Sequence, residues 1–259
     1  MNVETSTLFY TKSGNGKEVL LLFHGFGQDN AVFTPLAKSL ADRYTCYIFD
    51  LYFHGKSKWV NDEKPLEKSE WRNIMQSFLN ETHIKTFSIL GYSLGGKFAL
   101  ATVEAFPQMT RELFLLAPDG VTTNFWYSLA TYPWISRKLF KSMINHHGRF
   151  LTIGKSLHRI GLIDKGVLRF AEYQMDTAEK RKRVYYSWVV FRKLKFSMRD
   201  IGGLINQYKI SLTIIVGKYD KVITPKSMNR LSQSVEHHRL HVIEAGHNLL
   251  SARELGNLL

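Results

Sequence analysis

The sequence predicts an α/β protein with a mostly parallel central sheet, flanked by helices and interrupted by a helical insertion. Short, continuously apolar runs alternate with helical patterns up to residue 118, and this alternation returns after residue 200. Apolar strands separated by helices are typical of a parallel sheet covered on both faces. Residues 119–200 contain no convincing buried strand and instead carry aromatic and basic residues at helical spacings.

Each predicted strand is a short apolar run that ends at a turn or at a polar residue. In chain order these strands are Val19–Phe23, Thr45–Phe49, Thr86–Leu90, Leu113–Leu116, Leu212–Val216 and Leu240–Ile243. The helices predicted between them are Val32–Asp42, Ser69–Leu79 and Leu94–Ala105. Residues Ser6–Thr11 predict an additional antiparallel strand at the edge of the sheet.

The chain is expected to form one domain that carries an insertion. A length of 259 residues suits one sizeable domain and is short for two. Because the strand pattern resumes after the helical segment, we expect residues 1–118 and 201–259 to form the core and residues 119–200 to form a helical cap. A separate second domain is the alternative.

The composition excludes several classes of protein. With 44% hydrophobic and 22% charged residues, the chain is neither disordered nor fibrous. The only cysteine, Cys46, excludes an intrachain disulfide and a multi-cysteine zinc site. We expect no metal and no organic cofactor. Neither a secretory signal nor an apolar run long enough to span a membrane is apparent, so a cytoplasmic protein is expected.

Gly91-Tyr92-Ser93-Leu94-Gly95 is the strongest chemical motif in the sequence. It follows a predicted buried strand and precedes a predicted helix, which is the context of a G-x-S-x-G nucleophile elbow. The two glycines leave room for a sharp turn that exposes the Ser93 hydroxyl. The helix start directs the Leu94 N–H toward the same space, where it could stabilise a developing oxyanion.

A serine nucleophile needs a base and an acid that orients the base. His247 directly follows the last predicted strand and is the preferred base over His237 and His238, which precede that strand. Asp220 follows the strand Leu212–Val216 and is the preferred acid. Asp119 also ends a strand and is the rival acid, although Pro-Asp-Gly is a common turn sequence.

The segment His24-Gly25-Phe26-Gly27 follows the first predicted parallel strand. Its glycines allow the backbone to approach a ligand closely, and the Phe26 N–H is the predicted second oxyanion donor. His24 and Gly25 in this segment are also predicted to contact substrate. The same role is predicted for two aromatic residues, Tyr92 in the elbow and Trp126 in the cap.

These motifs resemble those of the α/β-hydrolase superfamily, and within it the small serine hydrolases with a helical cap. The resemblance extends from about Ser6 to the end of the chain. It also includes Asp50 to Ser57, which is similar to a D-x-x-G-x-G-x-S loop with Phe53 in place of the first glycine. The resemblance implies a cap inserted after the sixth strand of the family and the order nucleophile, acid, base for Ser93, Asp220 and His247.

The activity expected from these residues is hydrolysis of a carboxylic ester or thioester through an acyl-enzyme. One alternative is a lyase of the menaquinone pathway, which the chain resembles around Gly91 to Leu100, with Lys97 where that branch often has arginine. Another is a ligand-binding member of the fold without catalysis. An aspartate is the nucleophile of dehalogenases, so Ser93 argues against that branch.

The basic charge is concentrated in the predicted cap. Residues 119–200 contain 16 Lys or Arg and six Asp or Glu, so they carry +10 of the net +13. One interpretation of this charge is that the cap attracts a small acyl substrate that is anionic. The preferred interpretation is that the basic residues form a solvated outer face. The run Lys180-Arg181-Lys182-Arg183 is interpreted as a solvated helix face; peripheral binding to an anionic lipid surface ranks below that, and nucleic acid is not expected. The chain is expected to be a monomer or a homodimer.

Overall fold

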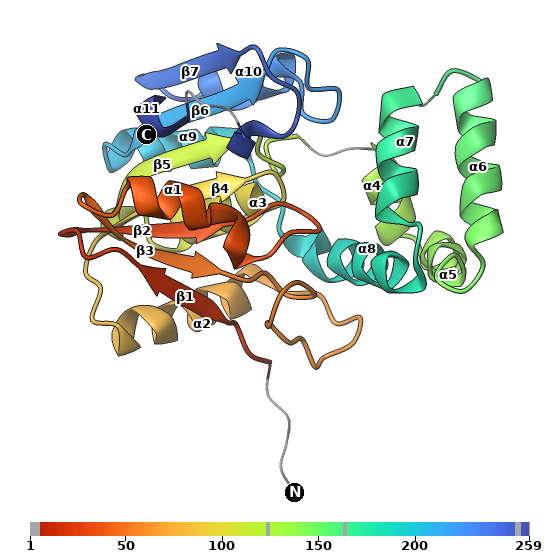
Figure 1. Ribbon diagram of the computed structural model, residues 1–259, viewed down its shortest axis with the longest axis horizontal. Helices are drawn as coiled ribbons and strands as arrows, with labels where there is room; N and C mark the ends of the chain where they lie inside the picture. Colours follow the sequence, from red (N-terminus) through yellow and green to blue (C-terminus); the bar gives the residue numbers. More distant parts are fainter. Residues whose placement is uncertain (1–5, 123–124, 163–164, 252–254, 259) are drawn as a thin grey trace, which may run out of the picture.

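The computed structural model describes residues 6–122, 125–162, 165–251 and 255–258, and its centre is a seven-stranded sheet (Figure 1). The strand order is β1-β3-β2-β4-β5-β6-β7, with β1 antiparallel to β3 and every other neighbouring pair parallel. The strands are β1 (Tyr10–Ser13), β2 (Glu18–Phe23), β3 (Tyr44–Phe49), β4 (Phe87–Tyr92), β5 (Thr110–Leu116), β6 (Ser211–Gly217) and β7 (His238–Ile243). The predicted fold class is confirmed.

Alternate residues of the apolar strands face two separate hydrophobic clusters, one on each side of the sheet. In β2, Leu21 and Phe23 pack in the cluster that includes residues of α2, α3 and α9, whereas Leu20 and Leu22 pack with residues of α1 and α11. The helices that cover the sheet are α1 (Thr34–Ser39), α2 (Lys68–Glu81), α3 (Gly95–Ala105), α9 (Met198–Gln207), α10 (Asn229–Ser232) and α11 (Leu255–Leu258). Burial on both faces explains why the inner parallel strands are mostly apolar, whereas β7, at the edge, is partly exposed.

Short 3-10 helices complete the secondary structure. They are η1 (Asn30–Phe33), η2 (Pro107–Met109), η3 (Phe191–Lys193), η4 (Pro225–Met228) and η5 (Leu249–Ser251). The predicted helix 32–42 is thus η1 followed by the shorter α1, where Pro35 occupies the start of the helix. The predicted edge strand is displaced along the chain: of residues 6–11, only Tyr10 and Thr11 are in β1.

Between β5 and β6 the described residues form helices and no strand. Before η3 and α9, these helices are α4 (Phe125–Thr131), α5 (Trp134–Ser142), α6 (His147–Arg159), α7 (Lys165–Gln174) and α8 (Ala178–Val190). In Figure 1 they stand beside the carboxyl edge of the sheet. Phe140, Tyr185 and Val189 belong to a hydrophobic cluster that is separate from the two beside the sheet. We call residues 119–200 the cap below; its division from the core stays a prediction.

The run Lys180 to Arg183 differs from the predicted solvated face. Arg181 is 8% exposed, and its guanidinium donates hydrogen bonds to the carbonyls of Ile144, Met175 and Asp176. Lys180 pairs with the Asp176 carboxylate at 3.0 Å. The charge pattern was misleading here because one cation of the run is an internal hydrogen-bond donor that joins α8 to the preceding helices.

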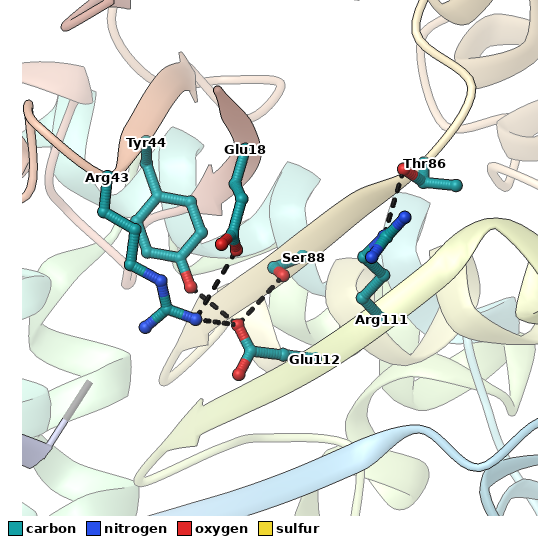
Figure 2. A network of polar contacts seen from close by, with 7 residues as sticks. All are labelled: Glu18, Arg43, Tyr44, Thr86, Ser88, Arg111 and Glu112. Atoms are coloured by element: carbon teal, nitrogen blue, oxygen red, sulfur yellow. Dashed lines mark hydrogen bonds and ion pairs between the residues drawn. The ribbon is translucent and has the colours of Figure 1, made fainter. Parts of the chain in front are cut away.

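A polar network joins the amino ends of four adjacent strands, opposite the edge that carries the cap (Figure 2). The Glu112 carboxylate of β5 accepts hydrogen bonds from the Tyr44 hydroxyl at 2.6 Å, from Arg43 at 2.8 Å and from Ser88 at 3.3 Å. Arg43 also lies 3.5 Å from Glu18. Burial and the neighbouring carboxylate raise the pKa of Tyr44, so its hydroxyl stays a donor. These contacts link β2, β3, β4 and β5 near their amino ends.

Candidate active site

Ser93 lies on a sharp turn between β4 and α3, at the carboxyl edge of the sheet. Its φ of 49° falls in the left-handed region, which is costly for a residue with a Cβ. Backbone hydrogen bonds hold this conformation. The Ser93 N–H donates to the Leu116 carbonyl at 2.9 Å, and the Ser93 carbonyl accepts from the N–H groups of Gly96 and Asp119, both at 2.8 Å.

The glycines around Ser93 are required by close backbone approach. A Cβ on Gly95 would lie 1.9 Å from the carbonyl oxygen of Phe23, and a Cβ on Gly91 would lie 2.7 Å from the Cβ of Ala99. The start of α3 therefore packs directly against the end of β2. This contact brings the serine turn next to the loop that follows β2.

The structure brings Ser93, His247 and Asp220 into one hydrogen-bonded series. The Ser93 Oγ lies 3.0 Å from His247 Nε2, and His247 Nδ1 lies 2.7 Å from Asp220 Oδ2. The pairing of β6 with β7 sets up this arrangement, because Gly217 and Ile243 are register partners at the carboxyl ends of those strands. Asp220 and His247 follow within a few residues, on adjacent loops.

The two rival acids have different partners. Asp220 is buried, and its Oδ1 accepts hydrogen bonds from the N–H groups of Val222 and Ile223 at 2.7 and 2.9 Å. These bonds leave Oδ2 oriented toward His247. Asp119 instead accepts from the Gly120 N–H at 2.7 Å and pairs with Lys97 at 3.4 Å. The geometry favours Asp220 as the orienting acid.

The two predicted oxyanion donors lie on adjacent loops. Phe23 and Gly91 are register partners at the ends of β2 and β4, so the loops that carry Phe26 and Leu94 leave the sheet side by side. Within the part of the chain that the structure describes, neither the Phe26 N–H nor the Leu94 N–H has a hydrogen-bond acceptor. Both are thus available to a ligand oxygen, and their role stays a prediction.

Two buried imidazoles support the loop after β2. His24 Nδ1 contacts the Gly25 carbonyl at 2.7 Å, and its Nε2 accepts from the Leu51 N–H at 3.0 Å. His54 Nδ1 contacts the Tyr52 carbonyl at 2.9 Å, and its Nε2 accepts from the Gly27 N–H at 3.0 Å. Each Nδ1 must therefore carry the hydrogen.

Burial lowers the pKa of His24 and lowers that of His54 to about 3, so both rings are neutral. With both nitrogens engaged and no exposed surface, His24 supports the backbone, which argues against its predicted contact with substrate. Sequence reasoning missed His54 as a residue of the site. Its only signal was its place in the loop Asp50 to Ser57.

In that loop Phe53, which stands where the family pattern has a glycine, takes a left-handed backbone conformation that glycine favours. Phe53 has a φ of 68°, and its ring stacks on Tyr186 of α8 at 5.7 Å between centroids. Gly55 is close to the buried Asp50: a Cβ there would lie 2.0 Å from Oδ2. Phe53 thus lacks the conformational freedom of glycine, but its ring makes an aromatic contact with the cap.

The remaining predicted substrate contacts have mixed outcomes. Tyr92 is buried, and its hydroxyl donates to the backbone carbonyl of His247 at 2.9 Å, which points to positioning of that loop and argues against substrate contact. Burial raises the pKa of Tyr92 to about 12. Gly25 is buried against the Tyr92 ring. The side chain of Trp126 lies outside the described residues.

A buried cation connects the elbow helix to the cap. Lys97 of α3 is 5% exposed, pairs with Asp119, and lies 4.2 Å from the ring centre of Tyr127 in α4. The Tyr127 hydroxyl continues the chain of contacts to the carbonyl of Trp188 at 2.9 Å. Although burial alone would lower it, the pKa of Lys97 is raised by Asp119 and Tyr127. Lys97 is therefore a charged structural link.

No group of three or more His, Cys, Asp or Glu side chains in the described part of the chain is arranged to hold a metal ion. No described helix is both long enough and apolar enough to cross a membrane.

Comparison with known proteins gives a match to the family model of the alpha/beta hydrolase fold over residues 18–252. A pimeloyl-[acyl-carrier protein] methyl ester esterase of Stenotrophomonas maltophilia is 34% identical over 225 residues, which cover 83% of this chain and 80% of that protein. An uncharacterized protein of Mycobacterium tuberculosis is 32% identical over 126 residues, covering 47% of this chain. That match spans only 35% of the mycobacterial protein.

Solved structures resemble the whole chain in fold. An esterase from Thermogutta terrifontis superposes with a TM-score of 0.69 at 17% sequence identity, covering 97% of this chain and 91% of the esterase. At this identity the likeness concerns the fold alone.

Proposed function

The chain belongs to the alpha/beta hydrolase fold family, and we propose that it is a serine hydrolase that cleaves a carboxylic ester or thioester through an acyl-enzyme. One observation carries the proposal: the series from Ser93 Oγ through His247 to Asp220, with hydrogen bonds of 3.0 and 2.7 Å. The esterase named among the similar proteins supports the ester bond as the target.

In this mechanism His247 Nε2 accepts the Ser93 proton as Oγ attacks the carbonyl carbon. The tetrahedral oxyanion is held by the N–H groups of Phe26 and Leu94. His247 then gives its proton to the leaving alcohol or thiol, which leaves an acyl group on Ser93. Water activated by His247 releases the acid and restores the serine. Asp220 keeps the hydrogen on Nδ1, so that Nε2 is free to act as base.

The substrate class follows from the cap. Its net charge of +10 would attract an anionic substrate, and an acyl chain on a phosphate-bearing carrier fits both the charge and the aromatic content. The similar Stenotrophomonas protein is named for an ester on an acyl carrier protein. If the field assists capture, kcat/KM for an anionic ester should fall as salt rises, whereas a neutral ester of the same acyl group should respond little.

The two alternatives, a lyase and a non-catalytic binding protein, require different things of Ser93, His247 and Asp220. A lyase could use the same three side chains as a base, but the Lys97 cue for it is weakened because Lys97 is committed to Asp119 and Tyr127. A non-catalytic binding protein has no need for a serine held at an unfavourable φ beside an oriented imidazole.

A panel of aryl esters and acyl thioesters of graded chain length tests the proposal. We expect measurable turnover of at least one class, lowered at least about a thousandfold in Ser93→Ala. Absence of turnover across the panel, together with ligand binding by the intact protein, would favour the non-catalytic alternative. Absence of ester hydrolysis, together with proton abstraction from a non-ester substrate and expulsion of its leaving group, would favour the lyase.

A further inference from the structure

Exposed apolar side chains are concentrated on the cap. Of the fourteen large hydrophobic residues that are prominently exposed among those described, nine lie between residues 125 and 174. They are Leu129, Tyr132, Trp134, Ile135, Leu139, Ile153, Ile160, Leu162 and Tyr173. Scattered single residues of this kind are ordinary on a protein surface, whereas a concentration of them in one segment marks a contact site.

The α5 helix carries the clearest part of this surface. Trp134, Ile135 and Leu139 are 59%, 74% and 47% exposed, and Lys138 lies among them. Positions i, i+1, i+4 and i+5 share one face of a helix. Phe140 is buried on the other side, in the cap's own hydrophobic cluster. The exposed face is thus not needed to fix α5 to the protein.

The same segment is cationic and contributes no acidic residue of its own, although the Glu63 carboxylate of the core pairs with Lys141 of α5. From Gly120 to Ile163 the chain contains six Lys or Arg and no Asp or Glu. Lys138, Lys155 and Arg159 are exposed, and the described residues supply no carboxylate to pair with them. The Lys138 ammonium lies 3.9 Å from the ring centre of Trp134, so the cation and the indole occupy the same spot.

We propose that α5 and α6 form a docking face for an anionic lipid surface, with Trp134, Ile135 and Leu139 entering the interfacial layer. Trp prefers the boundary between lipid headgroups and acyl chains, and Lys can extend its ammonium to the phosphates while its stem stays in apolar surroundings. Figure 1 shows α5 and α6 on the side of the cap away from the sheet.

A second copy of this chain is a poorer occupant. A symmetric dimer through this face would bring the same cations of both copies together, and the segment from Gly120 to Ile163 supplies no carboxylate to neutralise them. An anionic lipid surface supplies both the negative charge and the apolar layer. The docking role does not depend on the proposed hydrolase activity.

Co-sedimentation of the whole protein with vesicles tests this proposal. We expect binding to vesicles that are one third phosphatidylglycerol in phosphatidylcholine, and little binding to phosphatidylcholine alone. The double variant Trp134→Ser with Ile135→Ser should lower the partition coefficient at least about tenfold, and Lys138→Glu with Lys155→Glu should do the same. Their melting temperatures should stay near the wild-type value, because all four side chains are exposed.

Matched changes on the core separate this face from a general attraction. Tyr208→Ser with Leu240→Ser removes exposed apolar side chains elsewhere, and Lys85→Glu with Lys226→Glu changes the net charge equally. Both core variants should bind anionic vesicles as the wild type does, apart from a small charge effect. The proposal would be overturned if the wild type did not bind vesicles, if the cap apolar variant bound as well as the wild type, or if the core charge variant lost as much binding as the cap charge variant. It would also be overturned if sedimentation velocity showed a dimer that only the cap variants abolish, with no binding to vesicles.

Discussion

At the scale of single residues, the site depends on which carboxylate faces His247. Asp220 and Asp119 both follow sheet strands, and the sequence alone does not show which of them contacts His247. In the structure, two backbone N–H groups hold one oxygen of Asp220 and leave the other 2.7 Å from His247 Nδ1. Asp119 is engaged by Lys97. The two aspartates can therefore be tested against each other.

Asp220→Asn should lower kcat by about ten-thousandfold, because an amide at this position favours the wrong tautomer of His247. Asp119→Asn should change kcat by less than about tenfold, since that side chain pairs with Lys97. Steady-state kinetics on the best ester of the panel measure both. The opposite ranking would transfer the orienting role to Asp119.

Gly95→Ala should strongly destabilise the protein, because the added Cβ would lie 1.9 Å from the Phe23 carbonyl oxygen. Gly203→Ala is the matched control: it is also helical, and no atom lies within 4 Å of its added Cβ. Thermal unfolding should show a lower midpoint for the first variant and an equal or higher one for the second. Similar midpoints for both would contradict the close packing of α3 on β2.

At the scale of elements, the five inner parallel strands, β2 to β6, could be predicted because burial on both faces makes them mostly apolar, whereas the edge strand β7 is partly exposed. The edge strand β1 was placed several residues early. Its residues are only partly buried, so hydrophobicity does not mark its ends. The elbow could be predicted for a different reason: its glycines and its serine lie within five consecutive residues, so the motif is visible in the sequence.

The supporting residues of the site could not be predicted in the same way. His54 reaches Gly27 across 27 residues, and Tyr92 reaches the His247 backbone across 155. Such contacts depend on how the loops meet at the sheet edge, which periodicity does not encode. Arg181 shows the same limit, because its burial under Ile144 and Met175 reverses what its basic neighbours suggest.

The link from α3 to α4 through Lys97 should contribute measurably to stability. Lys97→Met leaves the partly buried Asp119 without its cation, and we expect a loss of about 1–3 kcal/mol in the free energy of unfolding. Lys68→Met breaks a pair with Glu104 in which both side chains are about one third exposed, and should cost less than about 1 kcal/mol. Urea titration compares them, and equal losses would remove Lys97 as a special link.

For the whole molecule, two neutral imidazoles in the core make stability depend on pH. Burial lowers the pKa of His24 and of His54, the latter to about 3. In the unfolded chain both would titrate near the ordinary value of about 6.5. Below that pH the unfolded state binds more protons than the folded state, so folding becomes less favourable as the pH falls.

The buried His54 imidazole should therefore cost about 2 kcal/mol of stability between pH 8 and pH 5, and His24 should add to the loss in the same direction. His54→Gln keeps an acceptor for the Gly27 N–H and a donor for the Tyr52 carbonyl but removes one titrating group. Its free energy of unfolding, measured in urea at both pH values, should fall by about 2 kcal/mol less than that of the wild type. His237→Gln, at an exposed position, should retain the wild-type difference; the same difference in His54→Gln would refute the role of burial.

The central claim is that Ser93 carries the acyl group during turnover. Rapid mixing with a slowly deacylated aryl ester, followed by acid quench and mass spectrometry, tests it most directly. We predict a burst of about one phenol per enzyme and a matching mass increase on the peptide that contains Ser93, both absent in Ser93→Ala. An acyl group on another residue, or wild-type turnover by Ser93→Ala, would contradict the account.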